Sequence, residues 1–185
     1  KRGPPPELVA AQRAPKSPPQ RFEIRYNPSS LIQVGPLVLA TCSVPPAVAE
    51  GLVNAGKEVP PPVRGRMLID TGATRTCIAA DVAEELLLVQ TGVGETYGAG
   101  GLHRLPVYGV KIEIHFSAAP GAFTLGSVRP VLAIPDFCKA FDPDKLQVTD
   151  GWPTRSLGLL GREFLANVVM NYDGHSGVIQ IRAAK

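Results

Sequence analysis

The segment 67–73, MLIDTGA, brings a carboxylate to the end of an apolar strand. The apolar residues lead directly into Asp70, and Gly72 lets the backbone approach a ligand closely. A carboxylate in this position can work as a general acid or base, because it can take a proton from water or give one to a substrate. The alternative is that Asp70 only caps a turn, and the tripeptide DTG alone does not exclude it.

Two further segments favour the catalytic interpretation. Residues 159–162, LLGR, lie about ninety residues after Asp70. Between them, Tyr97 to Gly101 form a glycine-rich segment that leads into a strand with alternating apolar and polar residues. Since a strand and not a helix follows these glycines, we do not expect them to bind phosphate.

These three segments, in this order, resemble the retropepsins, the retroviral-type aspartic proteases. In that family an apolar-apolar-Asp-Thr-Gly-Ala segment carries the catalytic Asp. A glycine-rich flap follows, and an apolar-apolar-Gly-Arg segment packs beneath the active-site loop. The resemblance covers roughly residues 36–182, and LGREFL at 160–165 makes the chain more similar to cellular or bacterial members than to a compact viral enzyme.

The resemblance implies a catalytic role for Asp70 and supporting roles for the residues around it. Thr71 would hydrogen-bond to the same loop of a second copy, and Gly72 would let the substrate backbone pass close. The supporting residues are Thr71, Gly72, Ala73, Gly161 and Arg162. The flap and the substrate-binding surface would comprise Thr74, Arg75, Tyr97, Gly98, Ala99, Gly100 and Gly101.

Hydrolysis of a peptide bond by carboxylates needs two of them sharing one proton. Carboxylates about 3 Å apart cannot both ionise easily, so their apparent pKa values separate. The chain holds one DTG, and the Asp-Gly steps at Asp150 and Asp173 lack the apolar lead-in. A bilobed monomer would need nearly twice this length. We therefore expect an endopeptidase that is a homodimer, with Asp70 of each copy facing the other and with no metal or cofactor.

One departure from the family pattern lies directly after DTGA. Viral members often place acidic residues there, which bind substrate and pair with the Arg of the Gly-Arg segment. Here Thr74 and Arg75 occupy those positions, so the usual partner of Arg162 is missing. We expect Arg75 to favour acidic or polar substrate residues. The departure also leaves open a binding or dimerisation module with this fold and little proteolytic activity.

The other reactive side chains have simpler interpretations. We expect Cys77 to be a small buried apolar residue, and a Cys42–Cys138 disulfide stays open. The three histidines, His103, His115 and His175, lack the spacing of a zinc site, and the Glu84-Glu85 pair indicates a solvated helix face. An unrelated β-barrel binding domain, in which DTG is accidental, is the remaining alternative.

Composition limits the class of protein to which this site can belong. The chain has 185 residues, 44% hydrophobic and 19% charged, with a net charge of +3 that is too small to indicate nucleic acid as the main partner. No apolar run approaches the roughly 18 residues of a membrane span. Residues 1–21 are rich in proline and predict a flexible arm, and residues 22–185 predict the protease domain. Because the chain begins with Lys1, we expect a domain taken from a longer protein or a processed form.

The expected elements give an all-β acid-protease barrel with one or two short helices. Strands are predicted at 22–26, 37–44, from 59–64 into 66–69, at 107–116, within 122–134 and at 178–181. The best helix lies at 79–89, and 163–168 predicts one or two further turns. Residues 94–101 predict a mobile turn, and 135–156 predict a long loop. The prolines before residue 62 indicate edges and turns.

Overall fold

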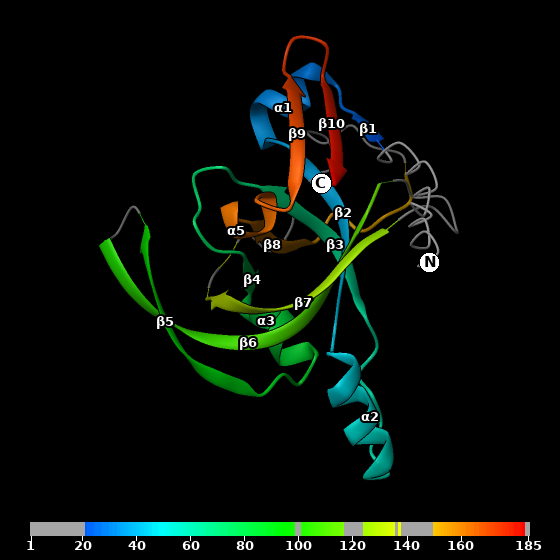
Figure 1. Cartoon of the computed structure of the whole chain (residues 1–185), viewed down its shortest axis with the longest axis vertical. Coiled ribbons are helices and arrows are strands. Elements are labelled where there is room, and N and C mark those ends of the chain that lie inside the picture. Colours follow the sequence, from blue (N-terminus) through cyan, green and yellow to red (C-terminus); the bar gives the residue numbers. More distant parts are fainter. Residues whose placement is uncertain (1–20, 99–100, 117–123, 136, 138–149, 184–185) are drawn as a thin grey trace, which may run out of the picture.

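The computed structural model describes residues 21–98, 101–116, 124–135, 137 and 150–183. The described chain is mostly β, with a few short helices around the strands (Figure 1). Residues 1–20, most of the predicted arm, lie outside this range, as does most of the predicted loop at 135–156. Among the described residues, no helix has the length and apolar character needed to cross a membrane.

Six strands form a closed barrel. Their order is β2-β3-β8-β4-β7-β6, and β6 closes the barrel by pairing with β2. A seventh strand, β5, extends from β6 as the other half of a hairpin. The strands are β2 (Leu37–Ser43), β3 (Val63–Ile69), β4 (Cys77–Ala79), β5 (Gln90–Gly98), β6 (Gly101–His115), β7 (Thr124–Ile134) and β8 (Ser156–Leu160).

Strand β6 alternates between apolar residues that face the barrel core and polar residues that are partly exposed. Val110, Ile112 and Ile114 are buried, whereas Lys111 and Glu113 are partly exposed. This confirms the predicted alternation at 107–116, because successive side chains of a strand point to opposite faces. The strand begins earlier than predicted, at Gly101, and pairs along β5, where Gly98 lies opposite Gly101. The predicted mobile turn at 94–101 is therefore mostly strand, and residues 99–100 lie outside the described residues.

A separate sheet of three strands packs above the barrel. Its order is β1-β10-β9, with β1 (Arg21–Arg25), β9 (Val168–Asp173) and β10 (Val178–Ala183). The predicted turn at Asp173 is confirmed, because its Oδ1 accepts hydrogen bonds from the backbone N–H groups of His175 and Ser176. The first strand begins at Arg21, one residue inside the segment assigned to the arm.

The helices correct several predictions. Prolines taken as turn signals instead open α1 (Pro28–Val34) and α2 (Pro46–Asn54), since Pro fits the first turn of a helix. The helix predicted at 79–89 is shorter, α3 (Ala80–Glu85), because Leu87 has a φ of 50° and ends it. The turn predicted at 163–168 is α5 (Arg162–Leu165), and β9 begins at Val168. The expectation that Glu84 and Glu85 form a solvated helix face is confirmed, since both are exposed, and Glu85 Oε2 also lies 2.6 Å from Arg155 Nη1.

A buried ion pair fastens the chain before β8 to the barrel. The Arg66 side chain is 4% exposed, and its Nη2 lies 2.7 Å from Asp150 Oδ1. Burial alone would raise the pKa of Asp150, but hydrogen bonds from Arg66 and the backbone of Trp152 lower it below its usual value. The Trp152 ring in turn contacts His115, whose Nε2 lies 2.9 Å from Thr41 Oγ1. Burial lowers the pKa of His115.

We predict that Asp150→Asn lowers the free energy of unfolding at neutral pH by about 3 kcal/mol, because Arg66 then stays buried without a counter-charge. Since the pKa of Asp150 is depressed on folding, its stabilisation is present above its unfolded pKa and is lost as pH falls through the folded value, below about pH 4. Urea titration at several pH values measures both the loss of stability at neutral pH and its dependence on pH. The control is Glu23→Gln, in an exposed pair with Arg25; equal effects of the two variants would contradict the prediction.

Candidate active site

The carboxylate of Asp70 is fixed by its own loop. Strand β3 ends at the buried Ile69, and the Asp70 N–H donates to Leu160 O at 3.0 Å. Asp70 Oδ1 accepts from the backbone N–H groups of Gly72 (2.8 Å) and Ala73 (3.2 Å). A Cβ at Gly72 would lie 3.1 Å from this oxygen, so the glycine lets the loop wrap closely around it. Both bonds use Oδ1, which leaves Oδ2 for a ligand or a partner.

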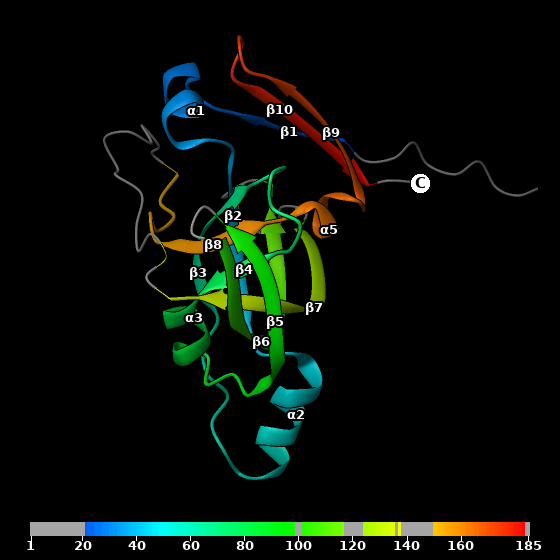
Figure 2. The ribbon, with the colours of Figure 1, turned by 90° about the vertical axis from the view of Figure 1, so that its left-hand side faces the viewer.

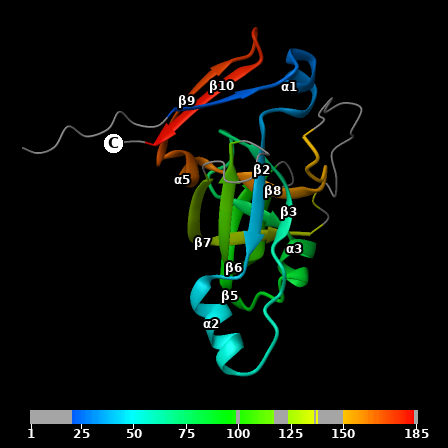
Figure 3. The same cartoon turned by 90° about the vertical axis from the view of Figure 1, so that its right-hand side faces the viewer.

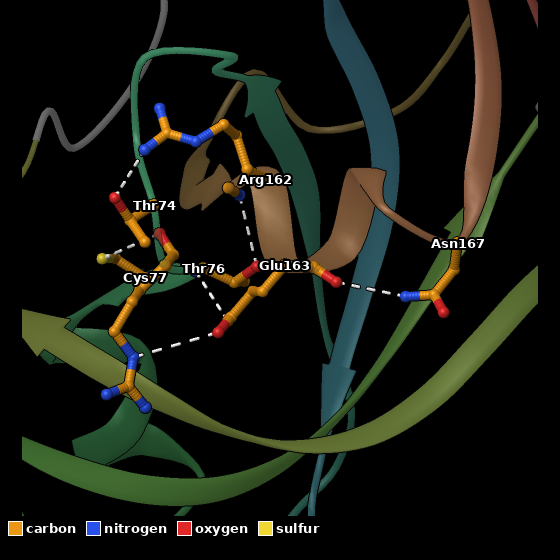
Figure 4. Close-up of polar contacts among 8 residues, drawn as sticks. Thr74, Thr76, Cys77, Arg162, Glu163 and Asn167 are labelled. Carbon is orange, nitrogen blue, oxygen red and sulfur yellow. Dashed lines mark hydrogen bonds and ion pairs between the residues drawn. The ribbon is translucent and has the colours of Figure 1, made fainter.

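Arg162 holds this loop from α5. Its Nη1 donates to the carbonyl oxygens of Thr71 (3.0 Å) and Gly72 (2.9 Å), and its Nη2 donates to Thr74 Oγ1 at 2.7 Å. The residue types after DTGA predict that Arg162 lacks its usual acidic partner. In the structure, neutral oxygens of the loop take that place, and Figure 4 shows the one from Thr74. Thr74, predicted to bind substrate, points its hydroxyl to Arg162.

The backbone of α5 adds a second set of bonds to the same loop. The N–H groups of Arg162 and Glu163 donate to the carbonyl oxygens of Ala73 (2.9 Å) and Thr74 (3.2 Å). Gly161 permits this approach, because a Cβ there would lie 2.4 Å from the carbonyl carbon of Arg75. Gly161 and Arg162, which the sequence predicts as supporting residues, thus lie in contact with residues 73–75 of the loop.

Glu163 is a part of the site that the sequence analysis missed. Its Oε1 accepts from the Thr76 N–H at 2.8 Å, and its Oε2 lies 3.9 Å from Arg75 Nε. Asn167 Nδ2 donates to the Glu163 carbonyl oxygen at 3.1 Å, which adds a bond at the end of α5 (Figure 4). The only sequence signal was an acidic residue directly after Gly-Arg, and such a residue is common in the first turn of any helix.

A pocket of about 780 Å³ separates the Asp70 loop from the β5–β6 hairpin. Figure 2 looks onto the side of the barrel that carries this hairpin. The pocket is lined from the loop side by Asp70, Gly72, Ala73, Thr74, Arg75 and Cys77, from the hairpin by Glu95, Thr96, Tyr97, His103 and Leu105, and elsewhere by Ile134, Pro135 and Leu159.

The lining brings together six of the thirteen residues predicted for the site, five from the Asp70 loop and Tyr97 from the hairpin. Tyr97 contributes from near the hairpin tip, where the residue is 82% exposed. Gly98 and Gly101 belong to the hairpin but not to the lining, and Ala99 and Gly100 lie outside the described residues. His103, interpreted as a solvated loop histidine, is exposed but stands on β6 and lines the pocket. Pairing across the hairpin brings it there, and this register was not visible in the sequence.

The two cysteines among the described residues, Cys42 and Cys77, are buried thiols. Burial raises the pKa of Cys77 to about 11, with nearby Glu163 adding to the effect, so the thiol stays protonated near neutral pH and is a poor nucleophile. Cys42 is a free thiol, and burial raises its pKa to about 12. Cys138 lies outside the described residues.

No cluster of three or more His, Cys, Asp or Glu side chains suited to a metal ion occurs in the described part of the chain. No protein-family model and no curated protein matches the sequence. The function is therefore inferred from the arrangement around Asp70.

We predict that Arg162→Lys loosens the Asp70 loop, because an ammonium group cannot make the same forked set of bonds. If the free energy of opening this loop falls by about 1 kcal/mol, the amide protons of residues 72–76 should exchange about fivefold faster. Hydrogen exchange read by mass spectrometry measures this. Arg25→Lys, at an exposed arginine on β1, is the control and should leave these amides unchanged. Unchanged exchange in both variants would show that Arg162 does not hold the loop.

Proposed function

We propose that the chain is one half of a dimeric aspartic endopeptidase with a retropepsin-like acid-protease fold. The observation that carries this proposal is the Asp70 carboxylate, held by two backbone N–H groups at the wall of a large pocket beneath a β-hairpin. A pocket of this size can take an extended peptide segment with several side chains.

The site is half of what the chemistry requires. Apart from Asp70, Glu95 is the acidic residue in the pocket lining, and its Oε1 lies 3.0 Å from Arg104 Nε on the facing strand. The described residues thus offer no second carboxylate in the loop beside Asp70. Thr71 and Gly72 are exposed in the single chain, as expected for residues that meet the same loop of a second copy.

One side of the molecule suits this contact. In Figure 1 the hairpin tip and the segment between β3 and β4 that carries Asp70 lie toward the left-hand side, and β9 is an edge strand of the sheet above them. An edge strand has unpaired backbone groups that can bond to another strand, and β9 also exposes Val169 and Tyr172. A second copy placed here by a twofold axis would bring the two Asp70 loops together.

The chemistry follows from a shared proton. One Asp70 carboxylate takes a proton from a water molecule, which attacks the peptide carbonyl carbon. The other Asp70, protonated, gives its proton to the carbonyl oxygen, and a tetrahedral intermediate forms. Proton transfer to the nitrogen then lets the C–N bond break. Closure of the β5–β6 hairpin would exclude other water.

Digestion of a diverse peptide library from about pH 3 to about pH 8 tests the proposal. We expect cleavage by the wild type and a loss of about a thousandfold in Asp70→Asn, which lacks the acid/base group. The control is Asp173→Asn, in an exposed turn at another Asp-Gly step. It should cleave as the wild type does.

Cleavage that survives in Asp70→Asn would contradict the proposal. No cleavage by any of the folded proteins would favour a binding or dimerisation module over a protease.

A further inference from the structure

Arg75 lines the pocket with a charge that its neighbour only partly balances. Its Nε lies 3.9 Å from Glu163 Oε2, and both side chains are 35% exposed. The shorter contact of the Glu163 carboxylate is with another residue, because its Oε1 accepts a hydrogen bond from the Thr76 N–H at 2.8 Å. A single contact at 3.9 Å with partial solvent exposure is a weak ion pair.

The guanidinium group reaches toward the hairpin. Its Nη1 lies 3.8 Å from the point where a Cβ of Gly94 would be. Because Gly94 has no side chain, nothing from that residue of β5 covers the arginine. Among the described residues, no hydrogen bond to either Nη atom is formed, so the forked face of the group is available to a ligand.

The other charges around the pocket leave Arg75 as its main binding group for an anion. The titratable side chains in the lining, besides the cysteine, are Asp70, Arg75, Glu95, Tyr97 and His103. Glu95 is paired with Arg104 across the hairpin, and Asp70 is assigned to the reaction.

We infer that Arg75 recognises a carboxylate side chain of the peptide substrate, and this inference rests on the proposed protease function. A glutamate or aspartate of the substrate can meet both Nη atoms in a forked pair, which is stronger than the single long contact with Glu163. In the free protein Glu163 is the counter-charge of Arg75, and the substrate carboxylate would take over that role.

The twofold symmetry of the proposed dimer extends the inference. Each copy contributes one Arg75, and the two lie on opposite sides of the shared Asp70 pair. The preference for an acidic residue should therefore appear at two positions, one on each side of the cleaved bond.

Peptide pairs that differ only by Glu or Gln at one position test this inference. The readout is the ratio of kcat/KM for the two peptides of a pair, measured at each position around the cleaved bond. We expect a ratio of about ten in favour of Glu at one position on each side. Arg75→Gln should bring the ratio to about one, Arg75→Lys should give an intermediate ratio, and Glu163→Gln should raise it above the wild-type value. A general loss of activity cancels, because each ratio compares two peptides on one enzyme.

A wild-type ratio near one at every position would overturn the inference while leaving the protease function intact. An unchanged ratio in Arg75→Gln would also overturn it. If no peptide is cleaved, the proposed function fails, and calorimetric binding of the same pairs to the Asp70→Asn protein decides the inference. Tighter binding of the Glu peptides would support recognition by Arg75, and equal binding would exclude it.

Discussion

The contact between α5 and the Asp70 loop is the constraint on which the site depends. A helix of one turn (Arg162–Leu165) supplies two backbone N–H groups, a guanidinium group and a carboxylate. These groups bond to six carbonyl, hydroxyl or N–H partners within residues 71–76. The loop itself has no regular structure, so these bonds take the place of a strand ladder. These bonds also set the orientation of Asp70, because the two N–H groups that bind its Oδ1 belong to this loop.

The barrel brings these two distant segments together. Strands β3 and β8 run parallel with Ile69 opposite Leu160, so the residues that follow each strand emerge side by side (Figure 3). Gly158 and Gly161 then let β8 and α5 pack closely, because a Cβ at either position would meet backbone atoms of Cys77 or Arg75. Small residues at these two places let a loop, a strand and a helix share one corner of the barrel.

The sequence predicted those strands in which the local pattern of apolar and polar residues matches their burial in the structure. Alternation predicted β6, and the apolar lead-in predicted the strand before Asp70. The pattern gave wrong predictions at two prolines. Pro28 and Pro46 were expected to mark edges and turns, but they begin helices. It also gave no sign that Glu163 would lie beside Arg75 or that His103 would line the pocket. Such contacts depend on strand register and helix placement, which residue types alone do not determine.

The claim that two copies share one active site is tested most directly by mixing. Wild-type protein is held at constant concentration while folded Asp70→Asn protein is added in increasing excess, and peptide cleavage is measured after exchange of subunits. If the two Asp70 residues act together, the wild type is drawn into mixed dimers and activity falls toward zero. Excess Asp173→Asn protein, which keeps Asp70, should add activity instead. Activity that stays constant as Asp70→Asn protein is added would show that each chain works alone and would contradict the shared site.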